Sequence, residues 1–284
     1  MILSASRRTD IPCYYGEWLV NRLKAGYVQV RNPMNPAQIR RVPLSPETVD
    51  AIVFWTKDPE PMIPLLDKID AMGYRYYFQF TLTPYDRTLE PHLRDKTCII
   101  RTFAGLSRRI GRDRVLWRYD PILLNDTLDM AYHREQFRRL CDVLSPYTPT
   151  VTISFVDMYA KIISPLVRII SEAEMLELAA FFGETAGEFG LGIRACCEAA
   201  DLTPCGIHPA SCIDPHVLKN LCGRPLHLPR DRNQRPGCGC VASIDIGAYN
   251  TCRSGCVYCY ANSHGEKAPL RRQKREYRPD AEML

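Results

Sequence analysis

The sequence predicts an α/β protein with a parallel sheet, arranged as a full or partial TIM-type (βα) barrel, with a doubly wound open sheet as the alternative. Short runs rich in β-branched and aromatic residues are mostly apolar without strict alternation, which is typical of buried parallel strands. Longer stretches with helical spacing lie between them, and strand follows strand at intervals of roughly 25 to 40 residues, as repeated βα units require. The length of 284 residues suits one such barrel.

The elements follow one another along the chain. Strand-like runs such as "AIVFW" and "TVTISFVD" alternate with stretches that have one apolar face, two of which stop at Gly73 and Gly111. The last helical stretch opens with Ser171 and Glu174 at the spacing of a capping box. The stretch 27–43 breaks this rhythm and predicts a hairpin. The predicted strands are 2–6, 51–55, 74–82, 114–120, 150–157, 191–197 and 243–247, and the predicted helices are 59–73, 98–111, 129–144 and 171–190.

The chain divides into four parts. Residues 1–198 carry the βα units of the barrel, and residues 199–242 hold six prolines and five cysteines. We expect irregular backbone in this second part, tied down by an auxiliary metal site. Residues 243–264 form the final βα unit of the same barrel, and residues 265–284 form a basic tail. The tail is compatible with nucleic acid as a partner, but a solvated tail is the commoner meaning of such a run, so nucleic acid is not favoured.

Composition narrows the classes of function. The net charge of +5 is mild and does not by itself imply nucleic acid. No run approaches the ~18 apolar residues that span a membrane, and the first residues lack the apolar core of a signal peptide. We therefore expect a cytoplasmic protein with no membrane partner. Structural disulfides are rare in that compartment, so thirteen cysteines indicate metal or redox chemistry.

Three cysteines near the end of the sequence form a compact triplet. Cys252, Cys256 and Cys259 have the spacing C-x3-C-x2-C. Structural zinc usually takes four ligands, so a zinc site here would need a further residue such as His264. A [4Fe–4S] cluster held by only three thiolates keeps one iron open for a small molecule. The triplet therefore indicates a cluster with an open iron, and a structural zinc site is the alternative.

The triplet resembles the signature of radical S-adenosylmethionine (SAM) enzymes, Cys-x3-Cys-x-aromatic-Cys, with Tyr258 of "CRSGCVYC" at the aromatic position. The chain also resembles DUF1848, an uncharacterised bacterial family of unknown function, in "SASRRTDIP", "VFWTKDP", "FQFTLT", "WRYDPI", "DRNQRPGCGC" and "DIGAYNTCRSGCVYCYAN". The resemblance implies that the triplet ligates a SAM-binding [4Fe–4S] cluster. Reductive cleavage of SAM would then yield a radical that abstracts hydrogen from a substrate. A flavodoxin- or ferredoxin-type protein would supply the electron. A weaker similarity to spore-photoproduct-lyase-like enzymes, which repair DNA, covers only this loop.

The position of the triplet departs from the radical SAM pattern. Those enzymes usually carry it after the first barrel strand, whereas here it follows the last predicted strand. The first and last strands of a barrel are neighbours, so a circular permutation would bring the triplet to the same place. We therefore expect 243–247 to serve as the usual first strand of the barrel, beside 2–6.

A second set of cysteines precedes the triplet. Positions that match motifs of the resembled family imply Cys196, Cys212, Cys238 and Cys240 as ligands of a second Fe–S cluster, with Cys197 and Cys205 in reserve. Cys238 and Cys240 stand on a glycine-rich turn, where backbone can wrap closely around an inorganic centre. A zinc ion that staples the irregular segment fits nearly as well.

Polar residues follow most of the predicted strands, where the chemistry of parallel barrels gathers. Charged side chains in such apolar surroundings are costly to bury unless they are paired, so they predict a polar pocket or internal ion pairs that brace the barrel mouth. An arginine fork suits a carboxylate such as that of SAM. As catalytic candidates we take Lys57, Arg118 and Asp120, and as cofactor-binding candidates Ser6, Arg7, Arg8, Asp10, Gln79, Thr81 and Asp157.

These observations together predict a radical SAM-type enzyme that reductively cleaves SAM to start radical chemistry on its substrate. No motif specifies whether that substrate is a nucleotide, a peptide or a sugar. The alternative is a non-catalytic Fe–S or zinc protein that acts as an interaction module for nucleic acid or protein. The feature that separates the two is the open iron of the triplet.

Overall fold

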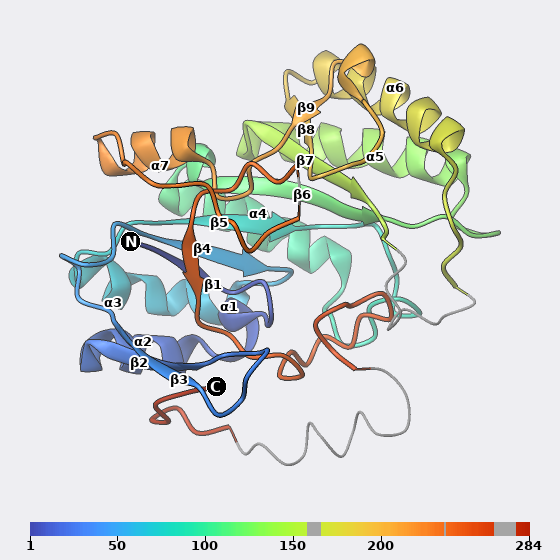
Figure 1. Ribbon diagram of the computed structural model, residues 1–284. Coiled ribbons are helices and arrows are strands. Elements are labelled where there is room, and N and C mark those ends of the chain that lie inside the picture. Colours follow the sequence, from blue (N-terminus) through green and yellow to red (C-terminus); the bar gives the residue numbers. More distant parts are fainter. Residues whose placement is uncertain (158–165, 236, 264–276) are drawn as a thin grey trace.

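The computed structural model describes residues 1–157, 166–235, 237–263 and 277–284 (Figure 1). Its centre is an eight-stranded sheet with the strand order β10-β1-β4-β5-β6-β7-β8-β9, in which all neighbours pair in parallel. A two-stranded antiparallel hairpin, β2–β3, lies apart from it. The predicted α/β class and the predicted hairpin at 27–43 are therefore confirmed. The strands are β1 (Ile2–Ala5), β2 (Tyr27–Arg31), β3 (Ile39–Pro43), β4 (Ala51–Thr56), β5 (Tyr76–Thr81), β6 (Val115–Ile122), β7 (Thr150–Phe155), β8 (Gly192–Ala195), β9 (His208–Pro209) and β10 (Ser243–Asp245).

The helices include the four predicted ones and three that were not predicted. The first predicted stretch is a 3₁₀ helix running into α3, because proline nitrogens within it cannot donate to an α-helical ladder. The helices are α1 (Ile11–Tyr14), α2 (Gly16–Ala25), α3 (Leu66–Ala71), α4 (Lys96–Ile110), α5 (Met130–Leu144), α6 (Glu172–Glu188) and α7 (Pro215–Cys222), and the 3₁₀ turns are η1 (Glu60–Leu65), η2 (Arg112–Arg114), η3 (Ser145–Tyr147) and η4 (Thr203–Cys205).

The sheet does not close into a barrel among the described residues, because β10 and β9 are its two edges. β9 is only two residues long, and its Pro209 has no N–H for a further strand. The chain after β9 turns back over the sheet, where it forms α7 and a bridge between Arg230 and Val241. The full TIM barrel, one of the two forms of barrel predicted, is therefore not confirmed for the described residues. An open parallel sheet is what forms.

The final strand lies where the barrel argument predicts it. β10 pairs in parallel with β1, in the register Ile2 with Ser243 and Ser4 with Asp245. The first strand and a strand that begins at residue 243 are therefore neighbours in the sheet (Figure 1). This pairing delivers the residues that follow β10 to the carboxyl ends of the other strands.

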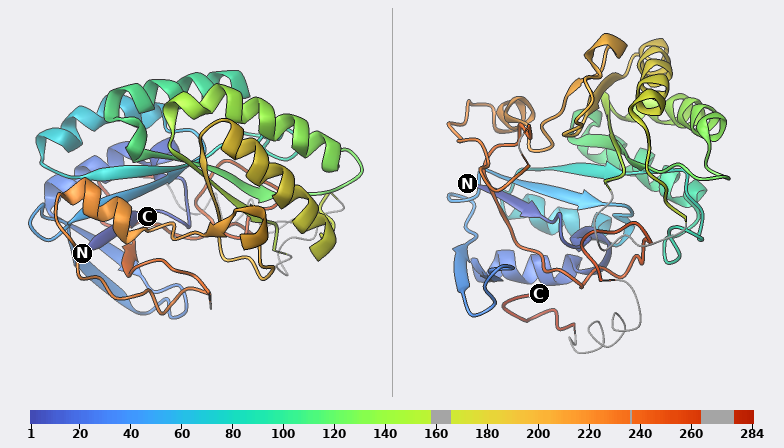
Figure 2. Two further views of the ribbon diagram at one scale, coloured as in Figure 1. Left: turned by 90° about the horizontal axis from the view of Figure 1, so that it is seen from above. Right: turned by 45° about the vertical axis from the view of Figure 1, so that its right-hand side comes forward.

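The two faces of the sheet are covered differently. Large side chains such as Phe54, Phe78 and Trp117 pack against α2 to α6, which line one face of the curved sheet (Figure 2). The opposite face carries residues such as Val53 and Tyr77 and is covered by α7 and the cysteine-rich segment. The part predicted as irregular, 199–242, therefore fills the side of the sheet that would be the interior of a barrel.

The C-terminal residues do not form a free tail along their whole length. Trp18 Nε1 donates to the Ala281 carbonyl at 2.7 Å, and Asn21 donates to the Pro279 carbonyl at 3.0 Å. The end of the chain thus docks on α2 through main-chain acceptors. The prediction of a solvated tail is wrong for residues 277–284, and the rest of the predicted tail, up to residue 276, lies outside the described residues. Of the helices that the structure describes, none has the length and apolar character needed to cross a bilayer.

Candidate functional site

A cavity of about 400 Å³ opens at the carboxyl ends of the parallel strands. Its walls come from the ends of β1, β4, β5, β6 and β7 and from the cysteine-bearing loops after β8 and β10. All seven cysteines predicted as metal ligands line it: Cys196, Cys212, Cys238, Cys240, Cys252, Cys256 and Cys259. Among the polar candidates, it is lined by Ser6, Arg7, Arg8, Asp10, Lys57, Thr81, Arg118, Asp120 and Asp157.

Gln79 is the candidate that the structure places elsewhere. It is buried in β5 and lines a second cavity, while its Nε2 donates to the Cys212 carbonyl at 2.7 Å. β-strand side chains alternate between faces, so Gln79 and Thr81 share a face, but only Thr81, nearer the strand end, reaches the main cavity. Gln79 therefore supports Cys212 and does not line the main cavity.

The loop after β1 is held by Asp245, a residue of β10 that the sequence did not single out. Its carboxylate accepts from Ser6 Oγ at 2.6 Å and from the Arg7 backbone N–H at 2.8 Å. Gly247 allows this approach, since a Cβ there would overlap Ser6. Ser6 thus acts as a brace between β1 and β10. Arg8 lies on the same side, with Nη1 3.5 Å from the Gly247 carbonyl.

Arg7 and Trp55 present unused donors beside this brace. The Arg7 guanidinium lies over the Trp55 ring, 4.8 Å from its centroid. Arg7 Nη2 and Trp55 Nε1 are both buried, and neither has a hydrogen-bond partner among the described residues. Buried donors without partners are rare in proteins, and both residues line the cavity. Their arrangement fits a ligand that brings its own acceptor, such as a carboxylate.

Asp10 is occupied by local structure. One carboxylate oxygen accepts from the Cys13 N–H at 2.9 Å and caps α1, and the other accepts from the Lys57 N–H at 2.8 Å. Burial raises the pKa of Asp10 to about 7, although these N–H donors oppose the shift. Asp10 therefore ties the loop after β1 to the loop after β4, and its reach toward a ligand is limited.

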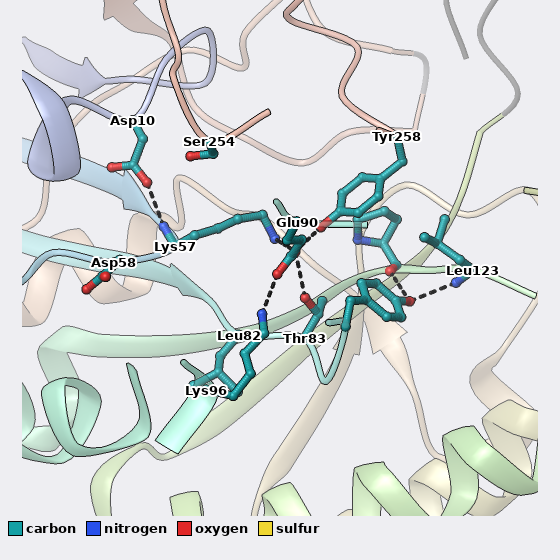
Figure 3. Close-up of polar contacts among 12 residues, drawn as sticks. Asp10, Lys57, Asp58, Leu82, Thr83, Glu90, Lys96, Leu123, Ser254 and Tyr258 are labelled. Atoms are coloured by element: carbon teal, nitrogen blue, oxygen red, sulfur yellow. Dashed lines mark hydrogen bonds and ion pairs between the residues drawn. The ribbon is translucent and has the colours of Figure 1, made fainter. Parts of the chain in front are cut away.

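Lys57 belongs to a buried ionic network centred on Glu90, which the sequence analysis missed (Figure 3). Lys57 Nζ lies 2.8 Å from the Glu90 carboxylate, Thr83 Oγ1 donates to it at 3.0 Å, and Lys96 and the Tyr258 hydroxyl also bind it. Burial alone would raise the pKa of Glu90, but the two lysines outweigh it and lower the pKa to about 2. Lys57 is thus committed to holding Glu90 and, through it, Tyr258.

The same region clamps the triplet loop by its backbone. The Val257 N–H donates to the Leu89 carbonyl at 3.0 Å, and the His92 N–H donates to the Ser254 carbonyl at 3.3 Å. Gly255 has φ of +72°, and a Cβ there would lie 2.8 Å from the His92 ring. The loop therefore has one conformation that brings the aromatic residue of the signature onto Glu90.

The triplet cysteines line the cavity from this clamped loop. Cys256 is buried, and Cys252 Sγ lies 3.4 Å from Ser254 Oγ. Burial raises the pKa of Cys252, and it raises that of Cys256 well above the usual range even though Lys57 opposes the shift. Without a metal these thiols would therefore stay protonated at neutral pH, and metal binding would have to displace their protons.

Arg118 and Asp120 form an ion pair on the floor of the cavity. Arg118 Nε lies 3.0 Å from the Asp120 carboxylate, which also accepts from the Ser154 hydroxyl. Burial alone would raise the pKa of Asp120, but the Arg118 guanidinium and the Ser154 hydroxyl together lower it. Arg118 Nη1 reaches beyond the pair to Cys212 Sγ at 2.9 Å. On the rim, Asp157 pairs with Arg235.

The four cysteines of the second predicted set come together from three segments. The reserve residue Cys197 also lines the cavity, whereas Cys205 lies against α6, with its Sγ 3.8 Å from the Leu176 carbonyl. Within the described parts of the chain, no three His, Cys, Asp or Glu side chains surround one point as the ligands of a metal ion would. The cysteines contact one another in pairs.

Comparison with known proteins identifies the family alone. The model of the DUF1848 family, a domain of unknown function, matches residues 2–261. No curated protein matches. Among solved structures, the chain resembles a protein of Bacteroides thetaiotaomicron VPI-5482 that is provisionally described as an alpha-L-fucosidase, with 11% identity and a TM-score of 0.28, over 75% of this chain and 82% of that one. A likeness this distant carries no argument about activity. The chain belongs to the DUF1848 family.

Proposed function

We propose that this member of the DUF1848 family is a radical SAM-type enzyme, circularly permuted relative to the usual order of barrel strands. Cys252, Cys256 and Cys259 would hold a [4Fe–4S] cluster, and SAM would occupy the cavity beside it. The observation that carries the proposal is that these three thiols line one cavity together with strand-end residues of β1, β4, β5, β6 and β7. Such a cluster would supply an open iron for SAM and the electron for its reductive cleavage.

The residues of the cavity divide the remaining work. Arg7 Nη2 and Trp55 Nε1, the buried donors without partners, are the groups that would bind a carboxylate. Asp245 holds the Arg7 backbone in place through Ser6 and the Arg7 N–H, so the guanidinium enters the cavity from a fixed point. Preorganised donors of this kind lose little entropy on binding.

The other end of the cavity is suited to a substrate. Thr81, Asp120 and Ser154 lie at the ends of three successive strands of the sheet and line the same cavity as the triplet. Asp120 is held ionised by Arg118, so it could accept a hydrogen bond from a hydroxyl or amino group of a substrate. The cysteine-bearing loops after β8 and β10 form the other walls of the cavity.

The proposal is tested by anaerobic reconstitution with iron and sulfide, followed by a dithionite-driven assay of 5′-deoxyadenosine release from SAM. We expect release by the wild-type protein and its loss, by at least about a hundredfold (about 2.7 kcal/mol), in Cys256→Ala. Cys98→Ser is the matched control, since Cys98 lies in the first turn of α4, is not among the residues that line the cavity, and should not affect release.

Two results would contradict the proposal. One is stoichiometric zinc with no uptake of iron at the triplet. The other is iron uptake without SAM cleavage, which would leave a structural cluster or an electron carrier, the non-catalytic alternative.

A further inference from the structure

The second set of cysteines forms a group of contacts that the triplet chemistry does not explain. Cys196 follows β8, Cys212 precedes α7, and Cys238 and Cys240 stand on the glycine-rich turn before β10. Cys196 Sγ and Cys212 Sγ are 3.3 Å apart. The Cys240 thiol is hydrogen-bonded to Cys212 and also to Cys238. We call these residues the four-thiol group: their sulfurs form a continuous chain of contacts between three segments.

Two hydrogen-bond donors from the surrounding protein reach the sulfurs of this group. Arg118 Nη1 donates to Cys212 Sγ at 2.9 Å, and the Ile213 backbone N–H donates to Cys240 Sγ at 3.4 Å. Such donors outside the ligand set are what orients the ligands of metal sites.

The turn that carries Cys238 and Cys240 is built to hold both sulfurs on one side. Gly237 has φ of +83°, and a Cβ on Gly239 would overlap the Ser211 side chain. Arg230 Nε donates to the Cys238 carbonyl at 2.7 Å and fixes the turn from behind. The two glycines are therefore required by the shape of the turn, and that shape brings a C-x-C pair against Cys212.

The spacing of the sulfurs distinguishes between kinds of centre. Four thiolates around one zinc ion, with Zn–S bonds of about 2.3 Å in a tetrahedron, lie about 3.8 Å from one another. In a [4Fe–4S] cluster each thiolate binds a different iron, so the sulfurs are spread more widely. A disulfide would need about 2.05 Å. The 3.3 Å between Cys196 Sγ and Cys212 Sγ is closest to the first case.

We propose that Cys196, Cys212, Cys238 and Cys240 bind a single thiophilic metal ion, with zinc as the expected occupant. Metal–sulfur bonds would replace the pairwise thiol contacts, and all four positions of a tetrahedral ion would be filled by protein. The site would therefore be structural: it would fasten the segment from β9 to β10 over the sheet and form one wall of the cavity. This proposal does not depend on SAM chemistry at the triplet.

The test uses the full chain with the three triplet cysteines replaced, Cys252→Ala/Cys256→Ala/Cys259→Ala. Any metal that remains bound then reports on the four-thiol group alone. We expect about one zinc per chain by elemental analysis, and the visible bands of tetrahedral cobalt–thiolate coordination after exchange with cobalt. Adding Cys212→Ser to this protein should lower the zinc content at least about tenfold. Adding Cys222→Ser is the control, because Cys222 lies in the same segment with its Sγ against the Asp50 carbonyl, and the zinc content should not change.

A second measurement covers the case in which Cys212→Ser does not fold. In the triplet-less protein, alkylation of thiols followed by mass spectrometry should find the four cysteines protected until a chelator is added, while Cys222 reacts alike in both states. Three results would overturn the proposal: roughly four irons with acid-labile sulfide in place of zinc, a Cys196–Cys212 disulfide, or no bound metal with all four thiols reactive. None of them bears on SAM cleavage by the triplet, so the two proposals fail separately.

Discussion

The two cysteine-bearing regions face one cavity but are held in place by different means. The triplet loop is fixed from outside its thiols, by the Glu90 network and by backbone hydrogen bonds to residues 89–92. The four-thiol group is joined largely through the sulfurs themselves. The difference teaches that the triplet loop is held in shape largely without contribution from its thiols. The segment over the sheet, in contrast, should depend on its ligand for its shape.

The largest effect is expected at the anchor of the triplet loop. Glu90→Gln leaves Lys57 and Lys96 buried without their counter-charge, which should lower the free energy of unfolding by about 3–5 kcal/mol, measured by urea denaturation at pH 7. The exposed Glu135→Gln on α5 is the matched control and should stay within about 0.5 kcal/mol of wild type.

Wild type and Glu90→Gln can also be compared across a range of pH. The pKa of Glu90 is lowered to about 2 in the folded state, whereas an unfolded glutamate titrates near ~4.3. The stabilisation by the carboxylate should therefore be complete above about pH 4.3 and disappear as the pH falls toward 2. A stability difference between wild type and Glu90→Gln that is constant across this window would show that the ionic network contributes nothing.

An intermediate effect is expected from removing the metal of the four-thiol group. With zinc at about a hundredfold its dissociation constant, chelation should lower stability by about 2.7 kcal/mol. Hydrogen exchange should accelerate in residues 208–241 and stay unchanged in residues 249–262, since that loop is held by Glu90. Equal acceleration in both regions would mean that the two are not independently supported.

The smallest effect is expected at the contact between the triplet loop and its anchor. Tyr258→Phe removes one hydrogen bond to Glu90, which keeps Thr83 and both lysines as donors, so the cost should be about 1.5 kcal/mol in urea denaturation. Tyr132→Phe, which removes a hydrogen bond to the neutral Pro84 carbonyl, is the matched control and should cost less. Iron uptake by the triplet should not change in either variant, and a large loss of iron in Tyr258→Phe would assign the hydroxyl a direct part in holding the cluster.

Part of this molecule could be predicted because its signals are local or follow from topology. The strands, the four main helices and the convergence of strand-end residues rest on periodicity and on the geometry of parallel sheets. The place of β10 beside β1 follows from the neighbourhood of first and last strands in a barrel. Some local signals were present but overlooked: α7 begins with Asp214 as its cap and Pro215 in its first turn, and it ends at Gly223.

The rest depends on contacts that no spacing reveals. Glu90 is a single acidic residue in a loop, and its role appears only when Lys57, Lys96 and Tyr258 meet around it. The open edge of the sheet depends on how the segment after β9 packs, which is a matter of tertiary contacts rather than of β-propensity. Asp10 and Gln79 lie near the right strand ends. Only the structure shows that Asp10 accepts hydrogen bonds from backbone N–H groups and that Gln79 Nε2 donates to a backbone carbonyl.

The pairing of β10 with β1 also orders events during synthesis of the chain. Ile2 leaves the ribosome long before its partner Ser243, and at roughly 5–20 residues per second the interval is tens of seconds. For that time the outer edge of β1, a strand with three apolar residues and Ser4, is an unpaired strand edge on a nascent chain. The cysteine triplet emerges later still, so any metal centre it receives is installed on a sheet whose other strands have already been made.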